Sequence, residues 1–208
     1  MPKLLHLSCS PRPESESAAG ARVFLDSFRQ ARPDWDVDLW DLWREQMPEF
    51  AGPIVDAKYA RLKGQTFTEP QRDRFAEAER MAMRLALADR VLISTPMWNF
   101  GIPYKLKQWF DIIIQPGLTF GFNPSQGYLG LLKDRPTVVI LASGGDFSTG
   151  MNRGRTDMAT PYMREALRFI GIRDVRFVLI GPTTGPTEPI EAARKSAHQR
   201  LAAIAAHL

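Results

Sequence analysis

The residues most informative about the fold are Val91-Leu92-Ile93-Ser94-Thr95-Pro96-Met97-Trp98-Asn99-Phe100-Gly101-Ile102-Pro103. They begin as a short apolar, β-branched run, which predicts a buried strand, and then change abruptly to proline, aromatic and small polar residues before a helical pattern begins. Ligands of open α/β sheets bind in the crevice at the carboxyl ends of the strands. We therefore expect a ligand site where this strand ends.

Five stretches of this kind alternate with amphipathic helical patterns along the chain. The strands are expected at Lys3–Ser8, Asp36–Leu42, Arg90–Thr95, Thr137–Ala142 and Asp174–Ile180. The helices are expected to begin near Ser17 and at Thr68, and to cover Tyr104–Ile114, Thr160–Phe169 and Pro189–Ala206. This alternation predicts an α/β three-layer doubly wound sandwich with a five-stranded parallel sheet in the order 2-1-3-4-5. Residues 47–64 are predicted to be an irregular excursion, and residues 117–132 a loop or small hairpin.

Length and composition fit one globular domain over residues 1–208. The chain has 208 residues, of which 44% are hydrophobic and 24% charged. Apolar runs stay well below the roughly 20 residues that span a bilayer, so we expect a cytoplasmic protein without a membrane partner. The lone Cys9 agrees with a reducing compartment and is expected to be a small buried residue. The net charge of +4 comes from basic residues interleaved with acidic ones, which argues against nucleic acid and favours an anionic small ligand.

The loop after the first strand has the features of a phosphate site. Ser10, Ser15 and Ser17 offer hydroxyl groups, and the start of the following helix leaves backbone N–H groups free. Helix capping would explain one of these serines, but not three. The loop lacks the glycines of a dinucleotide fingerprint and the Gly-Lys-Ser/Thr of a nucleoside triphosphate site. A small tyrosine phosphatase would need arginine at the position of Ser15.

The loops after the third and fourth strands open on the same edge of the sheet as the serine loop. Trp98 offers a wide aromatic surface and Asn99 both a donor and an acceptor, although packing of this loop into the core is equally compatible with the residues. Gly144 and Gly145 either let a planar ligand approach the backbone or simply form a turn. Together the three loops describe a ligand with a phosphate at one end and a flat, polar-edged ring system at the other. Flavin mononucleotide (FMN) has this shape.

The chain resembles the FMN-dependent NADH azoreductases and NAD(P)H quinone oxidoreductases of the flavodoxin-like fold. Pro96-Met97-Trp98-Asn99-Phe100 is similar to the family's Pro-Met-Tyr-Asn-Phe segment, and Leu106-Lys107-Gln108-Trp109-Phe110-Asp111 to its Leu-Lys-x-Tyr/Trp-Phe-Asp helix. A late signature runs from Thr156-Asp157 through Thr160-Pro161-Tyr162 to Phe169-Ile170-Gly171-Ile172. The order and spacing of these motifs agree with the family over most of the chain.

The resemblance implies a single FMN-binding domain and a set of cofactor-binding residues. The phosphate would be held by Ser10 and the triplet Ser15, Glu16 and Ser17; the isoalloxazine would be lined by Met97, Trp98, Asn99 and Phe100; its pyrimidine side would meet Ala142, Ser143, Gly144 and Gly145. Glutamine is usual where Glu16 stands, and a carboxylate beside a phosphate is unfavourable unless it points away. The family often has arginine at the position of Ser143, and residues 144–155 are longer than usual.

The implied reaction passes two electrons from NADH or NADPH through the flavin to a quinone or azo compound, by ping-pong exchange in one cavity. No catalytic protein residue and no metal are expected, because His6, His198 and His207 lie on a strand and near the last helix. We expect Phe122, or less favourably Phe120, to line the substrate pocket, since both follow the flavin-lining helix. Arg153 or Arg155 is expected to favour the 2'-phosphate of NADPH. A homodimer is implied, with Phe50–Tyr59 contributing to its interface.

Other functions remain compatible with these residues. A related flavin enzyme could reduce free flavin, nitro compounds or chromate instead of quinones. A non-enzymatic electron carrier of the flavodoxin type is disfavoured because such carriers tend to be strongly acidic for docking, whereas this chain is basic. A flavin-free regulatory protein on the same fold is a third alternative, since a fold does not by itself imply chemistry.

Overall fold

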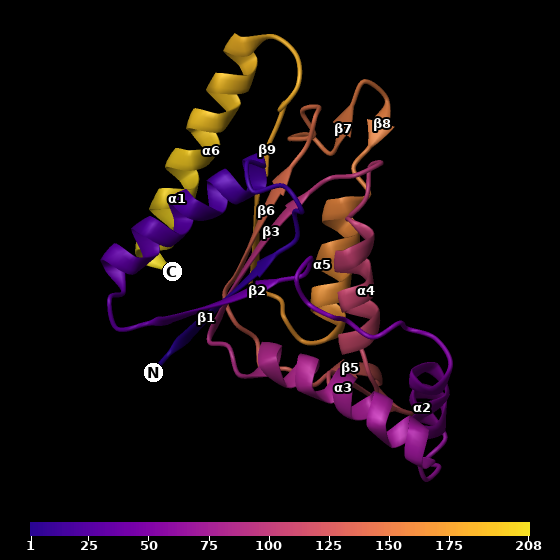
Figure 1. Ribbon diagram of the computed structural model, residues 1–208. Coiled ribbons are helices and arrows are strands. Elements are labelled where there is room, and N and C mark those ends of the chain that lie inside the picture. The colour runs from indigo at the N-terminus through magenta and orange to yellow at the C-terminus, as the bar shows by residue number, and fades with distance from the viewer.

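The computed structural model describes all residues 1–208, and a five-stranded parallel sheet forms its centre (Figure 1). The strands pair in the order β2-β1-β3-β6-β9. This is the predicted 2-1-3-4-5 order, so the predicted fold class is confirmed. Their bounds are β1 Lys3–Ser8, β2 Asp36–Asp41, β3 Arg90–Pro96, β6 Thr137–Ala142 and β9 Val175–Ile180.

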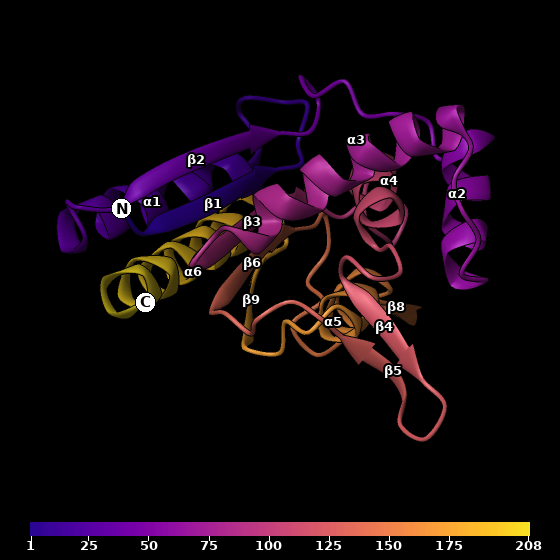
Figure 2. The same cartoon turned by 90° about the horizontal axis from the view of Figure 1, so that it is seen from below.

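Helices cover both faces of the sheet (Figure 2). One face packs against α1 and α6, and the other against α3, α4 and α5. A further helix, α2, packs on α3 away from the sheet. The bounds are α1 Glu16–Ala31, α2 Pro53–Leu62, α3 Glu69–Ala86, α4 Tyr104–Ile113, α5 Ala159–Phe169 and α6 Thr187–His207.

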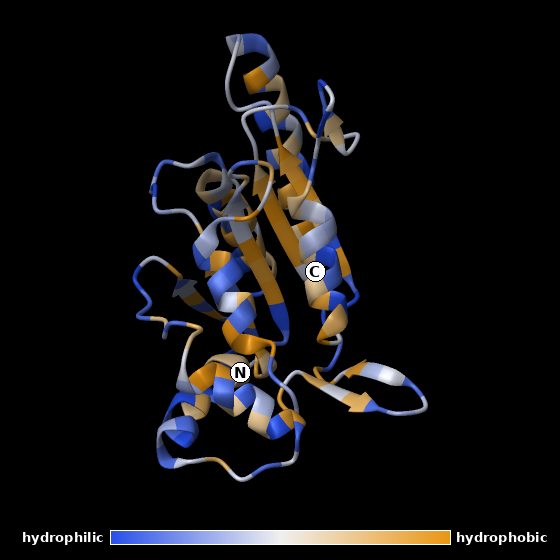
Figure 3. Ribbon diagram, turned by 90° about the vertical axis from the view of Figure 1, so that its right-hand side faces the viewer, coloured by the Kyte–Doolittle hydropathy of each residue, from blue (hydrophilic) through white to orange (hydrophobic).

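Alternating strand residues separate two apolar cores, because successive side chains of a strand point to opposite faces. On β1, Leu5 and Leu7 join the core under α3, α4 and α5, whereas Leu4 joins the core under α1 and α6. The central strands β3 and β6 are largely apolar (Figure 3), as expected for a parallel sheet that is covered on both faces, whereas the edge strand β2 carries three aspartates. Gly20 brings α1 close to the sheet, since a Cβ there would lie 2.9 Å from Ile180 Cδ1.

The structure corrects the prediction that residues 47–64 are irregular. Helix α2 lies within them and buries Ile54, Ala57 and Ala60, which are spaced by three residues along one helical face. The surrounding prolines and glycines obscured this short pattern, although Pro53 is well suited to the first turn of a helix.

The predicted hairpin at 117–132 is present as β4 Phe120–Asn123 and β5 Gly127–Gly130. A second small hairpin consists of β7 Met151–Asn152 and β8 Arg155–Thr156.

None of the six helices is both long and apolar enough to cross a membrane.

A buried histidine links the two central strands. His6 on β1 is 6% exposed, and its Nε2 lies 2.9 Å from Ser94 Oγ on the neighbouring β3. Burial, helped by the positive charge of Arg29, lowers the pKa of His6 to about 4. The imidazole is therefore neutral in the folded protein at neutral pH, as desolvation of a charged form predicts.

We predict that His6 makes the protein less stable as the pH falls from 6.5 towards 4. The unfolded histidine binds a proton more readily than the folded one, so its contribution is complete above pH 6.5 and decreases by about 2 kcal/mol at pH 5. The free energy of unfolding in urea should therefore be measured for wild type and His6→Gln at pH 7 and at pH 5. From pH 7 to pH 5, wild type should lose about 2 kcal/mol more stability than the glutamine variant. Parallel pH dependences in the two proteins would contradict the assignment.

Candidate functional site

The loops after β1, β3 and β6 meet at the carboxyl edge of the sheet and enclose a pocket of about 310 Å³. Backbone hydrogen bonds join the bases of these loops: Cys9 N–H donates to Ser94 C=O at 2.9 Å, and Met97 N–H donates to Ala142 C=O at 2.7 Å. The predicted convergence of three loops is therefore present. The lining residues are Ser10, Arg12, Glu14, Ser15, Glu16, Pro96, Met97, Trp98, Ala142, Gly144, Thr183 and Thr184.

The serine loop presents hydroxyl and backbone donors at the start of α1. Ser15 is the N-cap, and its Oγ accepts from Ala18 N–H at 3.1 Å and lies 3.2 Å from Ser17 Oγ. The backbone N–H groups of Glu16 and Ser17 have no acceptor within the chain. Ser10 Oγ accepts from Arg12 N–H at 3.3 Å, which shapes the turn before the helix. Free donors and the positive end of the helix dipole suit an anionic group.

The carboxylate of Glu16 is paired with an arginine from the other end of the chain. Arg194 on α6 donates from Nε to Glu16 Oε2 at 3.0 Å and from Nη2 to Oε1 at 2.5 Å. These hydrogen bonds, opposed by partial burial, lower the pKa of Glu16. The bidentate partner turns the carboxylate towards α6 and neutralises it, which removes the electrostatic objection to an acid in this triplet.

The loop after β3 contains a tight two-residue turn. Trp98 and Gly101 exchange two backbone hydrogen bonds of 3.0 Å, and the residues between them have positive φ, 48° for Asn99 and 68° for Phe100. A type I' turn has this pattern and favours glycine at its second position, so Phe100 is held in a strained conformation. Asn99 and Phe100 are exposed, and Trp98 is 36% exposed at the pocket. The structure therefore does not pack this loop into the core.

Trp43 is a residue of the site that the sequence prediction missed. It follows β2, lies 5.8 Å from Trp98 between ring centroids, and contacts Tyr104 at 5.4 Å. Its indole N–H donates to Cys9 C=O at 3.0 Å, which ties it to the serine loop. The strand-end rule applied to the second strand would have pointed to this residue.

The glycines after β6 allow close packing of neighbouring segments. A Cβ at Gly145 would lie 1.8 Å from Asn152 Nδ2, and one at Gly144 would lie 3.2 Å from Thr184 Oγ1. Ser143 is buried and donates its hydroxyl to Gly145 C=O at 2.8 Å. Neither glycine N–H has an acceptor within the chain. Gly144 borders the pocket, while Ser143 and Gly145 support the loop behind it.

Phe120 and Phe122 do not lie at this pocket. Both belong to the β4–β5 hairpin, at the end of the sheet where the strands begin (Figure 1). Phe120 is 4% exposed and packs on Phe169 at 4.9 Å, whereas Phe122 is 60% exposed. The expectation overlooked the length of α4, whose ten residues carry the chain about 15 Å away from the carboxyl edge. Neither aromatic ring lines the pocket of its own chain.

Cys9 is fully buried in the core. Burial raises the pKa of the Cys9 thiol well above its usual range, so it is not a nucleophile at neutral pH.

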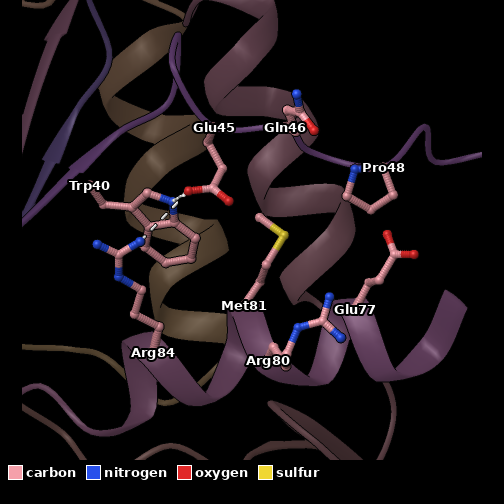
Figure 4. A pocket seen from close by; sticks show the side chains of 8 residues that line it. All are labelled: Trp40, Glu45, Gln46, Pro48, Glu77, Arg80, Met81 and Arg84. Carbon is pink, nitrogen blue, oxygen red and sulfur yellow. Dashed lines mark hydrogen bonds and ion pairs between the residues drawn. The ribbon is translucent and has the colours of Figure 1, made fainter. Parts of the chain in front are cut away.

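The hollow of about 150 Å³ in Figure 4 lies between α3 and the segment after β2. There Arg84 stacks on Trp40 at 4.4 Å and pairs with Asp38 at 2.7 Å, and Glu45 accepts from the Trp40 indole N–H at 2.8 Å. These contacts hold the segment against α3.

The fold and pocket define a doubly wound α/β protein with a pocket at the carboxyl edge of its sheet, and comparisons with known proteins agree with this fold. A profile for a family described as having a flavodoxin-like fold matches residues 2–204. The chain is 79% identical over 205 residues to FMN-dependent NADH:quinone oxidoreductase 1 of Bradyrhizobium diazoefficiens, covering 99% of both chains. It is 36% identical to FMN-dependent NADH:quinone oxidoreductase 3 of Pseudomonas fluorescens, covering 100% of this chain and 98% of the relative.

Solved structures give the same result. An azoreductase from Bacillus anthracis superimposes with a TM-score of 0.90 at 26% identity, covering 100% of both chains. An FMN-dependent NADH-azoreductase from the same species, in complex with FMN, superimposes with a TM-score of 0.83 at 26% identity, covering 99% of this chain and 100% of the other. The chain therefore belongs to the flavodoxin-like family and, within it, to the FMN-dependent NADH:quinone oxidoreductases. The resemblance drawn from the sequence motifs is confirmed.

We predict that Phe100→Gly stabilises the protein. Glycine adopts positive φ without strain, so the free energy of unfolding should rise by about 0.5–1 kcal/mol after its larger backbone entropy is subtracted. Urea unfolding of the flavin-free protein measures this. Phe122→Gly is the matched control, because Phe122 is also exposed but lies in a strand, where glycine should lower stability. Equal destabilisation by both substitutions would show that Phe100 is not strained.

Proposed function

We propose that this protein is an FMN-dependent oxidoreductase that uses NADH to reduce quinones and azo compounds at the pocket on the carboxyl edge of the sheet. The observation that carries the proposal is the convergence of three loops, each with free polar groups, on one pocket in a chain of this family. The 79% identical relative supports quinones as acceptors, and the azoreductase structures support azo compounds.

The residues around the pocket fit the two ends of FMN. The hydroxyls of Ser10 and Ser15 and the free N–H groups at the start of α1 would hold the phosphate, and the buried Ser17 Oγ, 3.2 Å from Ser15 Oγ, would support Ser15 from behind. Met97, Trp98, Asn99 and Phe100 would line the isoalloxazine. The backbone from Ala142 to Gly145, with the two free glycine N–H groups, would meet its pyrimidine edge. When bound, FMN supplies the hydride chemistry, and the protein supplies binding, orientation and electrostatics.

We propose that NADH and the acceptor use the space beside Trp98 in turn, which corresponds to ping-pong exchange. The Cys9 thiol is buried, and burial raises its pKa, so it would not act as a nucleophile in this reaction. The proposed role of the protein groups is to position the flavin and its substrates. Residues 1–208 would act as one FMN-binding domain in the cytoplasm, in agreement with a single free cysteine. The interleaved basic and acidic residues favour small anionic ligands over nucleic acid or membrane.

We further propose a homodimer in which the hairpin of one chain reaches the pocket of the other. Phe122 and Tyr128 on the hairpin are 60% and 62% exposed, and Tyr104 beside the pocket is 61% exposed. Tyr59 on α2, within the predicted interface region, is 57% exposed. Exposed aromatic residues of this kind are typical of interfaces. Sedimentation equilibrium that gave the mass of one 23.5 kDa chain would exclude this proposal.

Purified protein tests the proposed function directly. It should be yellow, lose this colour when NADH is added without oxygen, and regain it when a quinone follows, with no partner protein present. Steady oxidation of NADH with an azo compound should depend on the same flavin. A colourless protein that does not bind added FMN would exclude the proposal. Bleaching by NADH without reoxidation by quinones would favour an electron carrier or a reductase of other acceptors.

We predict that Arg194 affects FMN affinity through Glu16. In Arg194→Ala the Glu16 carboxylate would face the FMN phosphate without a partner, and repulsion of about 1 kcal/mol should raise the dissociation constant about fivefold. Glu16→Gln/Arg194→Ala should restore affinity to near that of Glu16→Gln. Titration of apoprotein with FMN, followed by flavin fluorescence, measures all four proteins. If Arg194→Ala weakened FMN binding by the same factor in wild type and in Glu16→Gln, Arg194 would act independently of Glu16.

A further inference from the structure

A second cavity of about 720 Å³ adjoins the strand-edge pocket and shares Gly144 and Thr184 with it. It is built from the loop after β6, the β7–β8 hairpin and the segment that leads into α6. These elements lie together beyond the carboxyl ends of β6 and β9 (Figure 1). None of its lining residues is hydrophobic. A ligand that leaves the first pocket past Gly144 would enter this polar space.

The cavity is positively charged at one wall. Arg153 and Arg155 line it, and neither guanidinium forms an ion pair or a hydrogen bond with the rest of the chain. The amide of Asn152 lies beside them. The acidic group of the lining is Asp146, whose Oδ1 accepts from Ser148 N–H at 2.8 Å. Two unpaired arginines against one acid favour an anionic ligand.

The opposite wall contains the start of α6. Pro186 is its N-cap and provides no side-chain hydrogen bond, and Thr187 and Glu188 N–H have no acceptor within the chain. Pro186 and Pro189 at the start of this 21-residue helix line the cavity, whereas Thr187 and Glu188 do not, and Glu188 adds a negative charge to the first turn. The arginines remain the stronger attraction for an anion.

The turn that carries the arginines is strained. Arg153 and Gly154 join Asn152 to Arg155 and have φ of 48° and 79°. A type I' turn of this kind prefers asparagine at its first central position, and an arginine with positive φ is unfavourable there. Strain of this kind indicates a constraint other than stability at that position. The need to place the charged side chain of Arg153 in the lining of the second cavity would be such a constraint.

We propose that this cavity binds the pyrophosphate and adenosine half of NADH while the nicotinamide enters the strand-edge pocket. The proposal rests on the proposed function. A pyrophosphate carries two negative charges, which match the two unpaired arginines, and the shared residues Gly144 and Thr184 let one dinucleotide occupy both spaces. Contacts between the cavity and this half of NADH would position the nicotinamide for hydride transfer. They would have no effect on the later step, in which the acceptor is reduced. Arg153 and Arg155 are thus specificity-determining residues for the electron donor.

The test is the double variant Arg153→Asn/Arg155→Gln, with Lys195→Gln/Arg200→Asn on exposed positions of α6 as the charge-matched control. Two donors are compared at saturating neutral quinone: NADH, and reduced nicotinamide riboside, which carries neither the pyrophosphate nor the adenosine. The double variant should raise KM about tenfold for NADH but leave KM for the riboside unchanged. Calorimetric titration with adenosine diphosphate ribose should show a matching loss of affinity, and asparagine at 153 should leave stability unchanged or higher.

The outcomes separate this proposal from the proposed function. If wild type oxidises neither donor, the proposed function fails. If it oxidises both and the double variant changes neither KM, the cavity does not bind the dinucleotide. Equal increases for both donors would place the arginines at the nicotinamide end instead. An increase in KM confined to a sulfonated azo acceptor, with NADH unaffected, would assign the cavity to anionic acceptors and overturn the proposal.

Discussion

Backbone hydrogen bonds at the carboxyl ends of the central strands are the constraint on which the site depends. They continue the sheet ladder into the loops: from Cys9 to Ser94, from Met97 to Ala142, and from Ser143 to Ile180 at 3.0 Å. Each loop therefore begins at a position set by its neighbour, and the free donors beyond it face a common space. A ligand that contacts all three loops meets groups that are already in place, which reduces the entropy lost on binding.

Charge pairing at this edge joins residues far apart in the sequence, whereas backbone strain is confined to two local turns. Glu16 and Arg194 are 178 positions apart, yet they join the starts of the first helix and the last one beside the serine loop. Two tight turns with positive φ, at Asn99–Phe100 and at Arg153–Gly154, lie next to residues that line the two adjoining cavities, Trp98 in the first and Arg153 and Arg155 in the second. The rigid sheet beneath can hold such conformations, because the stability of two large cores offsets their cost.

Prediction from the sequence succeeded where the pattern is local and repeated. Strand Lys3–Ser8 and strand Thr137–Ala142 were predicted to the residue, because each is a continuous apolar run bounded by polar or turn residues. The start of α3 followed from Thr68 and Gln71, whose side chain accepts from Thr68 N–H at 2.9 Å. Helix α2 was missed because it buries only three residues against α3. Its short amphipathic pattern was hidden among prolines and glycines.

The sequence by itself determined the alternation of strands and helices, the strand order expected of a chain of this size, and the three loops that meet at one edge. Each of these follows from residues close together in the chain. Only the tertiary structure decided that Trp43 packs beside Trp98, that Arg194 neutralises Glu16, and that two unpaired arginines line a second cavity. It also placed Phe122 at the far end of the sheet. Side-chain partners and the destination of a helix depend on packing between distant segments, which periodicity and local motifs do not encode.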